Sequence, residues 1–389
     1  MIYKTTNKKR VLHIITRLIP GGADENTIYT VSGLDKNRFL VDLMVGEEYD
    51  SSYAGLPVDA FMVNKQLSRN IHPLKDALAF ISIYKLIKQK RYDIVHTHTA
   101  KAGILGRFAA RCANVPVIVH TLHGSTFHSQ LHPPARFIFR LLERLGEKVS
   151  AKLITVGDDL RERYLSAKIG KPEKYITIRS GFDVSKFDLD SYTLKKDRAR
   201  LRNELGTPVR QPVIGTVARL EPRKGLGFLI SLAERLVRSN HNVHFYIAGD
   251  GPDYAALKEK IESKNLSDMI TLLGYRDDVE SVLASIDLFV LTSLWEGLPR
   301  VLVQAAMVGR PIVCFDVEGA KEIVYDGFNG YIVPIGDIDA LTEKVRYLLD
   351  QETLLRVMGD RSKSIDPSSW SKEVMISQIE TLYMETGCG

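Results

Sequence analysis

The chain has 389 residues, about two and a half times a typical domain of ~150 residues, so we expect two domains. With 44% hydrophobic and 26% charged residues it has the composition of an ordinary globular protein, which excludes collagen-like, coiled-coil and largely disordered chains. The net charge of +6 conceals a basic segment, residues 60–152, in which 15 Lys and Arg stand against 4 Asp and Glu, and this indicates an anionic partner.

Cysteine usage and the start of the chain indicate a reducing compartment. The three cysteines are odd in number and far apart, without C-x-x-C spacing, so neither a disulfide framework nor a structural zinc site is supported. Polar residues interrupt the apolar run at 11–19, and no run approaches ~18 apolar residues, so no export signal or membrane span is predicted. We expect a cytoplasmic protein, with peripheral contact to the inner face of the membrane left open.

Short β-branched runs alternate with longer segments of helical period along the whole chain. The runs are residues 11–18, 39–46, 93–98, 117–123 and 153–157 in the first half, and 213–218, 243–249, 269–274, 287–292 and 311–315 in the second. Near-continuous apolar strands separated by amphipathic helices predict parallel sheets covered on both faces. The predicted fold class is therefore α/β, with two Rossmann-like, doubly wound domains.

A polar stretch, residues 180–206, marks the joint between the two domains, because the strand pattern lapses there. We place the first domain at 1–185 and the second at 186–366, with the segment 367–389 expected to pack back on the first domain. A helix in that last segment is predicted by apolar or aromatic residues four apart: Met375, Ile379 and Tyr383.

The glycine pair Gly21-Gly22 lies between the first predicted strand and a helical stretch. Two glycines let the backbone come close to a ligand, and the amides that open a helix can face an anion. The spacing is not the G-x-G-x-x-G of dinucleotide binding, so an ordinary strand-to-helix turn stays equally open.

Two cations, Arg219 and Lys224, follow the strand predicted at 213–218. Ligands of open α/β sheets bind beyond the carboxyl ends of the strands, and a planar guanidinium together with an ammonium suits a diphosphate. Solvated basic residues in a loop are the competing interpretation.

The stretch Glu296, Gly297, Leu298 and Pro299 follows the strand predicted at 287–292. Pro299 suits a first helical turn, so the amides of Gly297 and Leu298 should lie at a helix N-terminus, where an anion is favoured. Because Glu296 would repel a bare phosphate, it is better suited to accept hydrogen bonds from sugar hydroxyls. Helix capping by Glu296 is the alternative.

Six of the ten histidines fall within 37 positions of the first half: His96, His98, His120, His123, His128 and His132. A metal site here would have to be all imidazole, because residues 94–137 include no acidic residue. We therefore expect no metal and interpret these side chains as neutral donors and acceptors for a polar ligand. His123 is the strongest candidate, since it stands at a strand-to-loop transition.

The chain resembles the family-4 retaining glycosyltransferases of the GT-B fold over essentially its whole length. Stretches in the right order carry the likeness: IPGGADENTIYTVSGL, DIVHTHTAKAGILGRFAARCANVPVIVHTLHG, TVARLEPRKG, IAGDGPDYAALK with LLGYRDDV, and LTSLWEGLPRVLVQAAMVGRPIV followed by EGAKEIVYDGFNGYIV. The resemblance implies a nucleotide-diphosphate sugar, most commonly a UDP-sugar, bound in a cleft between the domains. It implies no other cofactor.

The resemblance also implies roles for particular residues. Catalytic residues would be His123, Glu296, Arg219 and Lys224, with the two cations neutralising the diphosphate and Glu296, the first Glu of a Glu-x7-Glu motif, addressing the sugar hydroxyls. His123 would lie near the transferred sugar, and the Gly21-Gly22 loop would close over the diphosphate. The remaining donor-binding residues implied are Tyr275 and Arg276, whose loop reads the base, and Gly297, Leu298, Pro299 and Gln304.

Gln304 is a departure from the family pattern, because it replaces the second Glu of the motif, which accepts hydrogen bonds from the ribose hydroxyls in relatives. Gln retains one acceptor oxygen and adds two donors. We therefore expect the ribose contact to survive with about 1 kcal/mol lost.

The charges available predict catalysis without a metal ion. Asp277-Asp278 are adjacent and stand at a helix start, so they do not form an Asp-x-Asp metal site. The leaving diphosphate would be stabilised by Arg219, Lys224 and the helix start near Leu298. Retention of configuration is implied by the resemblance, whereas the route to it stays open.

The segment 133–152 combines basic and apolar positions in a way that is typical of an interfacial helix. Basic residues recur four apart at Arg136, Arg140, Arg144, Lys148 and Lys152, with apolar residues between them at Phe137, Phe139, Leu141, Leu142 and Leu145. Contact with an anionic membrane and a saccharide or lipid-linked acceptor are thus predicted. An ordinary surface helix is equally open, because Glu143 and Glu147 could neutralise part of the stripe.

Two rival functions share these motifs. A nucleotide-sugar 2-epimerase of the same fold would isomerise the donor without an acceptor, and a binding-only protein would bind the donor without turnover. A nucleic-acid partner is not expected, because the basic residues lack interleaved aromatic stacking positions and a recognised reading module. The conclusion from sequence is a hexosyltransferase of polysaccharide or glycoconjugate synthesis.

Overall fold

The computed structural model describes residues 8–128 and 130–387, and the chain divides into two compact units. The first unit comprises Met1–Phe182 and Ser369–Gly389, and the second comprises Asp183–Ser368. The boundaries expected from sequence, after residues 185 and 366, lie three and two residues from those of the structure. Each unit is described by itself below.

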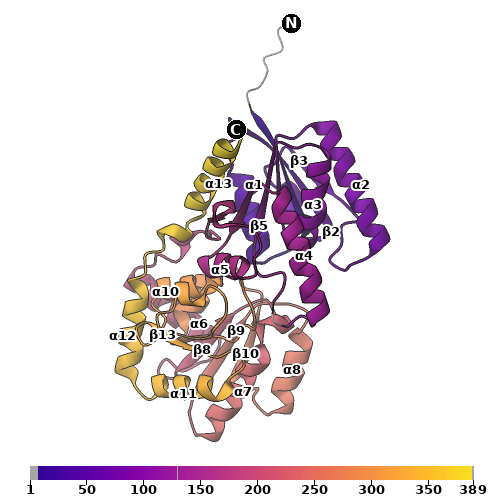
Figure 1. The fold of residues 1–389 in the computed structure, drawn as a ribbon. Coiled ribbons are helices and arrows are strands. Elements are labelled where there is room, and N and C mark those ends of the chain that lie inside the picture. The colour runs from indigo at the N-terminus through magenta and orange to yellow at the C-terminus, as the bar shows by residue number, and fades with distance from the viewer. Residues whose placement is uncertain (1–7, 129, 388–389) are drawn as a thin grey trace. The chain divides into compact units, whose positions relative to one another are not determined.

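The first unit is built on a parallel sheet of seven strands in the order β3-β2-β1-β4-β5-β6-β7 (Figure 1). The strands are β1 (Lys9–Leu18), β2 (Phe39–Tyr49), β3 (Ala60–Val63), β4 (Ile94–His98), β5 (Val117–Leu122), β6 (Lys152–Thr155) and β7 (Tyr175–Thr177). The helices are α1 (Gly22–Gly33), α2 (Pro73–Lys90), α3 (Ala100–Cys112), α4 (Pro133–Val149), α5 (Asp158–Ser166) and α13 (Lys372–Thr386).

Two apolar clusters fill the two faces of this sheet. One cluster joins β1 and β2 to α1 and to α13, through side chains such as Val31, Met375 and Ile379. The other joins the opposite face to α2 and α3, through side chains such as Ile83 and Ala102. Helices cover both faces of a parallel sheet, and residues at alternate positions of a strand point to opposite faces. A strand of such a sheet is therefore apolar at successive positions. The terminal helix α13 thus completes the core of the first unit, where it lies beside α1.

The second unit is built on a parallel sheet of six strands in the order β10-β9-β8-β11-β12-β13. The strands are β8 (Val213–Val217), β9 (His244–Ala248), β10 (Ile270–Gly274), β11 (Leu288–Leu291), β12 (Ile312–Phe315) and β13 (Gly330–Val333). The helices are α6 (Ser191–Glu204), α7 (Leu226–Arg238), α8 (Tyr254–Ser263), α9 (Val279–Ser285), α10 (Arg300–Met307), α11 (Ile338–Leu349) and α12 (Glu352–Lys363).

Both sheets are doubly wound, as predicted. In each unit the chain starts at a central strand, winds to one edge and then returns to the centre to wind to the other edge. The turning points, where loops diverge and leave room for a ligand, lie between β1 and β4 in the first unit and between β8 and β11 in the second. The fold class predicted from sequence is therefore confirmed.

Three strands and one helix were not predicted. The strands β3, β7 and β13 are sheet edges of three or four residues with half-exposed side chains, so they lack the continuous apolar run of a central strand. The helix α6 lies inside the polar stretch interpreted as the domain joint. It packs against α9 although it has few apolar residues. Its buried Arg202 contributes to this packing, because the guanidinium donates to backbone carbonyls and to Oδ2 of Asp287, the latter at 2.6 Å. Among the described residues, no helix is long and apolar enough to cross a bilayer.

Candidate functional site

The loops after β8 and β11 are joined to each other at the turning point of the second sheet. The amide of Leu294 donates to the carbonyl of Arg223 at 2.8 Å, and the hydroxyl of Thr292 donates to the carbonyl of Lys224 at 3.1 Å. Gly225 makes this approach possible: its φ is 59°, and a Cβ there would lie 2.2 Å from the carbonyl oxygen of Thr292. The predicted cations and the predicted carboxylate are thus held together by main-chain contacts.

Lys224 and Glu296 form a buried ion pair in this site. The ammonium of Lys224 lies 2.5 Å from Oε1 of Glu296, and the hydroxyl of Ser293 donates to the same oxygen at 2.7 Å. Burial alone would raise the pKa of the Glu296 carboxyl, but the charges of Lys224 and Arg223 and these hydrogen bonds outweigh it and lower the pKa. Glu296, only 6% exposed, is therefore ionised at neutral pH. It does not cap a helix, so that alternative is wrong.

Two further charged residues complete the cluster, and sequence reasoning passed over both. Arg223 donates from Nε to Oε1 of Glu221 at 2.5 Å and from Nη1 to Oε2 of Glu296 at 3.3 Å. Arg219 is a looser neighbour: its Nε lies 3.8 Å from Oε2 of Glu221, and its side chain makes no hydrogen bond to the described residues. Three cations thus face two carboxylates, which leaves one net positive charge. Glu221 and Arg223 both belong to the stretch 221–223, which lies between the two predicted cations in sequence, and this position could have been used to predict them.

The helix after Glu296 begins later than expected. Helix α10 starts at Arg300, and Pro299 precedes it at the N-cap position rather than in the first turn, as its ψ of 83° requires. Gly297 and Leu298 are both buried, yet within the described chain their amides donate no hydrogen bond. Buried amides normally have partners, so this pair indicates a place for an acceptor from a ligand.

The other donor-binding residues predicted in the second unit lie along the same strand ends. Gln304 lies on α10, half-buried, and its side chain makes no hydrogen bond to the described residues. Tyr275 follows β10 and is 67% exposed. Arg276 is held by Asp278 through two hydrogen bonds of 2.7 and 2.8 Å. Tyr275 and Arg276 follow the edge strand, whereas Arg219, Lys224 and Glu296 lie at the central turning point.

The first unit places the glycine pair at its own turning point. Gly21 is extended, and a Cβ there would meet only ordinary contacts, the nearest at 3.4 Å from Asp24, so the local fold does not require glycine. Across the turning point, Thr99 has φ 61° and ψ 162°, a region that β-branched residues rarely occupy. The strain is held by a 2.8 Å hydrogen bond between the hydroxyls of Thr99 and Thr16. Nothing in the sequence pattern pointed to Thr99.

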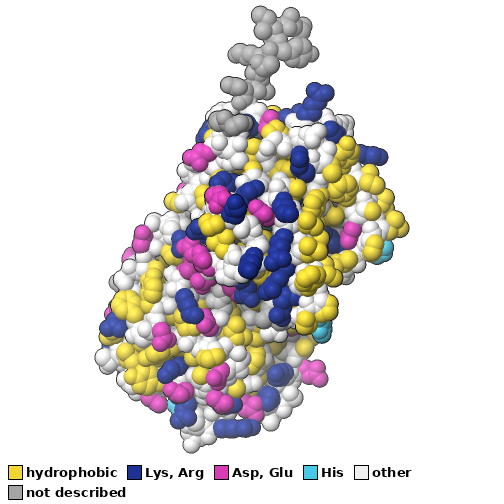
Figure 2. Space-filling view, in the orientation of Figure 1, with side chains coloured by type: hydrophobic (Ala, Val, Ile, Leu, Met, Phe, Trp, Pro, Cys, Tyr) yellow, Lys and Arg dark blue, Asp and Glu magenta, His cyan; other side chains and the backbone are white. Residues whose placement is uncertain are grey.

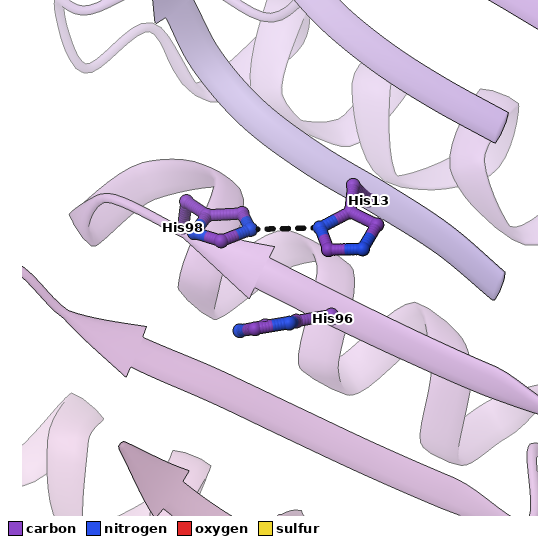
Figure 3. Close-up of side chains that lie close together, drawn as sticks. All are labelled: His13, His96 and His98. Atoms are coloured by element: carbon purple, nitrogen blue, oxygen red, sulfur yellow. Dashed lines mark hydrogen bonds between the residues drawn. The ribbon is translucent and has the colours of Figure 1, made fainter. Parts of the chain in front are cut away.

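His123 follows β5 and is half-buried, and its Nε2 lies 3.1 Å from Nδ1 of His98. Behind it the structure brings together three fully buried imidazoles, those of His13, His96 and His98, and one nitrogen from each lies within 4.8 Å of the other two (Figure 3). His13 was not among the predicted residues. It joins the group because β1 and β4 are neighbours in a register that pairs His13 with His96.

Two doubly wound units, each with polar side chains at its turning point, define the GT-B class of proteins. Comparison of the sequence with known proteins narrows this class to a family. Residues 20–186 match the family described as Glycosyltransferase Family 4, and residues 197–365 match Glycosyl transferases group 1. The UDP-Gal:alpha-D-GlcNAc-diphosphoundecaprenol alpha-1,3-galactosyltransferase of Escherichia coli is 30% identical to this chain over 387 residues, 98% of each.

More distant relatives agree. The capsular polysaccharide biosynthesis glycosyltransferase CapM of Staphylococcus aureus is 24% identical and covers 82% of this chain and 83% of its own. The crystal structure of HepE from Anabaena in complex with UDP-glucose has a TM-score of 0.79 at 23% identity, over 97% of this chain and 99% of that one. The chain belongs to family 4 of the glycosyltransferases and has the GT-B fold.

Proposed function

We propose that this chain transfers a hexose from a UDP-sugar, with retention of anomeric configuration, to a saccharide or lipid-linked saccharide acceptor in polysaccharide or glycoconjugate synthesis. The observation that carries the proposal is the charged cluster at the turning point of the second sheet, with the Lys224–Glu296 ion pair beside the buried amides of Gly297 and Leu298. The use of UDP-sugars and of lipid-linked acceptors by similar proteins, named for such reactions, supports it.

The cluster suits the departure of a nucleoside diphosphate. Cleavage of the anomeric C–O bond leaves both bonding electrons on the diphosphate, whose new charge needs stabilisation in place. Lys224 and Arg219 supply positive charge, and the amides of Gly297 and Leu298 supply hydrogen-bond donors. Because the ion pair with Glu296 already fixes the Lys224 ammonium, little reorganisation is needed when the bond breaks.

The carboxylate of Glu296 has capacity left for the sugar. An ionised carboxylate has about four acceptor sites, and in this cluster Lys224, Ser293 and Arg223 use three contacts. A sugar hydroxyl can donate to a remaining lone pair. His123 in the first unit is proposed to contact the transferred sugar. Gln304 would meet the ribose with its single carbonyl oxygen.

Turnover with a UDP-sugar is the direct test of this function. We expect UDP release from a panel of UDP-galactose, UDP-glucose and UDP-N-acetylglucosamine, offered with a GlcNAc-diphospho-lipid acceptor, and an α-linked product. Excess EDTA should leave the rate unchanged, because the charged cluster is proposed to act without a metal. Abolition of turnover by EDTA, with recovery on adding Mg²⁺ or Mn²⁺, would contradict the metal-independent mechanism. An isomerised sugar nucleotide without an acceptor product would contradict transfer itself.

The acceptor side is proposed to involve helix α4. Four large apolar residues of this helix are between 41% and 66% exposed: Phe137, Ile138, Leu141 and Leu145. Exposed basic residues, Arg140, Arg144 and Lys148, lie along an adjacent arc of the same helix, and Figure 2 shows basic and apolar side chains side by side there. Helix α2, which like α4 packs against α3, adds exposed Leu74, Leu78 and Ile81.

Among the described residues, Glu143 and Glu147 form no ion pair with the basic stripe, so the alternative that they neutralise part of it gains no support. Glu143 is 2% exposed and points inward, where it pairs with Arg107 of α3 at 2.9 Å. Glu147 is half-buried, and its Oε1 lies 3.9 Å from Nζ of Lys174. The outer arc of α4 therefore keeps its positive charge next to an apolar strip, which is the arrangement that binds anionic lipid.

Cosedimentation with vesicles tests the membrane surface. We expect the chain to bind phosphatidylglycerol vesicles in a salt-sensitive way and to bind phosphatidylcholine vesicles weakly. The double charge reversal Arg140→Glu and Arg144→Glu should lower the partition coefficient at least about tenfold, because each basic residue near an anionic surface contributes about 1 kcal/mol. The matched control reverses two exposed arginines of the second unit, Arg238→Glu and Arg356→Glu, and should bind normally. Binding that ignores both salt and the first double reversal would contradict the proposal.

A further inference from the structure

A continuous line of hydrogen bonds runs from His123 through the interior of the first unit. We call it the histidine chain, and its six members in order are His123, His98, His13, Tyr383, His96 and Thr121. Four of them come from the neighbouring strands β1, β4 and β5, His123 directly follows β5, and Tyr383 comes from the terminal helix α13. The five members behind His123 are buried. The histidine chain thus links His123 to Tyr383, which is 260 positions away in sequence.

Every ring nitrogen of the three inner histidines has a partner within the chain. Nε2 of His98 lies 3.0 Å from Nδ1 of His13, and Nδ1 of His98 lies 3.1 Å from Nε2 of His123. Nε2 of His13 lies 3.3 Å from the phenol oxygen of Tyr383. Nδ1 of His96 lies 2.5 Å from that same oxygen, and Nε2 of His96 lies 2.7 Å from the hydroxyl of Thr121.

The inner members are electrically neutral at physiological pH. Burial lowers the pKa of His13 to about 3 and places the pKa values of His96 and His98 well below their usual range. Burial also raises the pKa of Tyr383. Each inner imidazole therefore carries one proton, and the phenol keeps its own.

If every N–H and O–H of the histidine chain has an acceptor, only two proton arrangements remain for it. A neutral imidazole has one N–H donor and one acceptor nitrogen, and a phenol donates one hydrogen bond. A ring that donates through one nitrogen must accept through the other. The buried phenol of Tyr383 has His13 and His96 as its partners among the described residues, so it donates to one and accepts from the other. Fixing the direction of any one bond then fixes the direction of all the others. The tautomer of His123 is therefore set by the direction of the hydrogen bonds at Tyr383, beyond His98 and His13 along the chain.

The geometry at Tyr383 selects one direction. Its oxygen lies 2.5 Å from His96 but 3.3 Å from His13. O–H donors make shorter hydrogen bonds than N–H donors, so the phenol donates to Nδ1 of His96 and accepts from Nε2 of His13. Nδ1 of His13 is then an acceptor, which requires His98 to donate through Nε2 and to accept through Nδ1. His123 must in turn donate through Nε2.

We infer that the histidine chain makes His123 donate through Nε2 and so holds it as the Nε2–H tautomer, and that its acceptor nitrogen, Nδ1, accepts a hydrogen bond from a hydroxyl of the transferred sugar in the donor complex. The assignment of the sugar contact rests on the proposed function. His98, His13 and Tyr383 act through His123 and are positioning residues. A hydroxyl that donates to Nδ1 would be oriented by a ring whose own rotation is blocked by His98.

A metal ion is the competing occupant of the same histidines. One nitrogen from each of His13, His96 and His98 is close enough to the other two to bind the same ion (Figure 3). A divalent cation there would place two charges among neutral ligands in the core, and within the group no carboxylate or thiolate compensates them. It would also replace the 3.0 Å bond between His13 and His98. The hydrogen-bonded arrangement is therefore favoured.

The tautomer can be measured directly by NMR on the wild-type chain labelled with 15N-histidine. Long-range proton–nitrogen spectra distinguish a protonated from an unprotonated ring nitrogen, and a His123→Asn variant identifies the signals of His123. We expect a protonated Nε2 and an unprotonated Nδ1. A wild-type His123 with its proton on Nδ1 would overturn the inference, whatever the activity of the protein. A stoichiometric metal ion in the purified chain, by elemental analysis, would overturn it as well.

Tyr383→Phe tests the coupling along the chain. Loss of the phenol oxygen leaves the Nε2–H of His13 without an acceptor, so the bonds should reverse and shift His123 toward Nδ1–H by roughly tenfold or more. We expect kcat/KM for the UDP-sugar to fall by about the same factor. Tyr175→Phe is the matched control, because it removes another buried hydroxyl of the first unit, bonded to the carbonyl of Ile169, and should leave the tautomer unchanged.

The two proposals fail separately in this experiment. An unchanged His123 tautomer in folded Tyr383→Phe would overturn the coupling, even in a protein that transfers sugar. An Nε2–H tautomer that responds to Tyr383→Phe would support the inference, even in a protein that turns over no UDP-sugar, and the failure would then belong to the proposed function.

Discussion

Lys224→Met should lower kcat for sugar transfer by about 10²–10³-fold, which is the typical cost of removing one group that stabilises developing negative charge. Met has nearly the length of Lys but no charge, so the change removes the ammonium and little packing. The loss should appear mainly in kcat, because the diphosphate acquires its new charge as the glycosidic bond breaks. UDP release from the best substrate of the donor panel, at saturating and limiting concentrations, separates kcat from KM.

A second effect of Lys224→Met must be separated from catalysis. The substitution also leaves the buried carboxylate of Glu296 without its 2.5 Å partner, which should destabilise the second unit. The double variant Lys224→Met and Glu296→Gln removes that uncompensated charge, so we expect it to recover stability without recovering activity. Lys344→Met is the matched control, since Lys344 is an exposed lysine of the same unit paired with its sequence neighbour Glu343.

The outcome that would contradict the mechanism is specific. A folded Lys224→Met that retains kcat within threefold would show that the ammonium does not stabilise the leaving group. Recovery of kcat in the double variant would show that the loss arose from the stranded carboxylate. Either result would move the proposed chemistry away from the turning point of the second sheet.

The strands and the loops that follow them could be predicted from sequence because both depend on local pattern. Parallel strands buried on both faces give continuous apolar runs, and ligands of such sheets bind at strand ends, so the positions of Arg219, Lys224 and Glu296 directly after such runs already indicated a site. Edge strands such as β13 escaped, because half-exposed residues give no continuous run. The start of α10 at Arg300 escaped because proline also precedes helices at the N-cap.

Contacts between residues distant in sequence could not be predicted. Tyr383 and His13 are 370 positions apart, and only the packing of α13 on the first sheet brings the phenol to the imidazole. In sequence, Tyr383 is simply an aromatic residue on a helical face, and His13 is a polar interruption of an apolar run. The inward direction of Glu143 likewise depends on Arg107, which lies 36 positions away on α3.

Glu143→Ala should destabilise the first unit by about 3–5 kcal/mol, the usual result of removing one partner of a buried ion pair. Arg107 is fully buried, and its Nη2 donates to Glu143 at 2.9 Å while its Nε donates to the carbonyl of Gly103 at 2.8 Å. Gly146 is part of the arrangement, because a Cβ there would lie 2.5 Å from the guanidinium carbon. Without Glu143 the guanidinium would remain buried with its charge uncompensated.

Urea unfolding of the first unit measures this cost. The two tryptophans of the chain fall one in each unit, so the fluorescence of Trp370 reports the first unit in a Trp295→Phe background. Glu47→Ala is the matched control, because Glu47 and Lys75 form an exposed pair at 3.7 Å that should contribute at most about 1 kcal/mol. Arg107→Met combined with Glu143→Leu should recover most of the loss, since apolar residues often replace a buried pair without cost. A cost below about 1 kcal/mol for Glu143→Ala would contradict this account.

The same pair explains why α4 presents its apolar strip to solvent. Residues two apart on a helix lie on nearly opposite sides, so an inward Glu143 places Leu141 outward. Turning α4 to bury Leu141 would pull the carboxylate away from Arg107 and leave an unpaired guanidinium in the interior. The buried charge pair thus makes the exposed apolar surface the lower-energy arrangement, and a loss in Glu143→Ala as large as expected here would measure how firmly that surface is held in place.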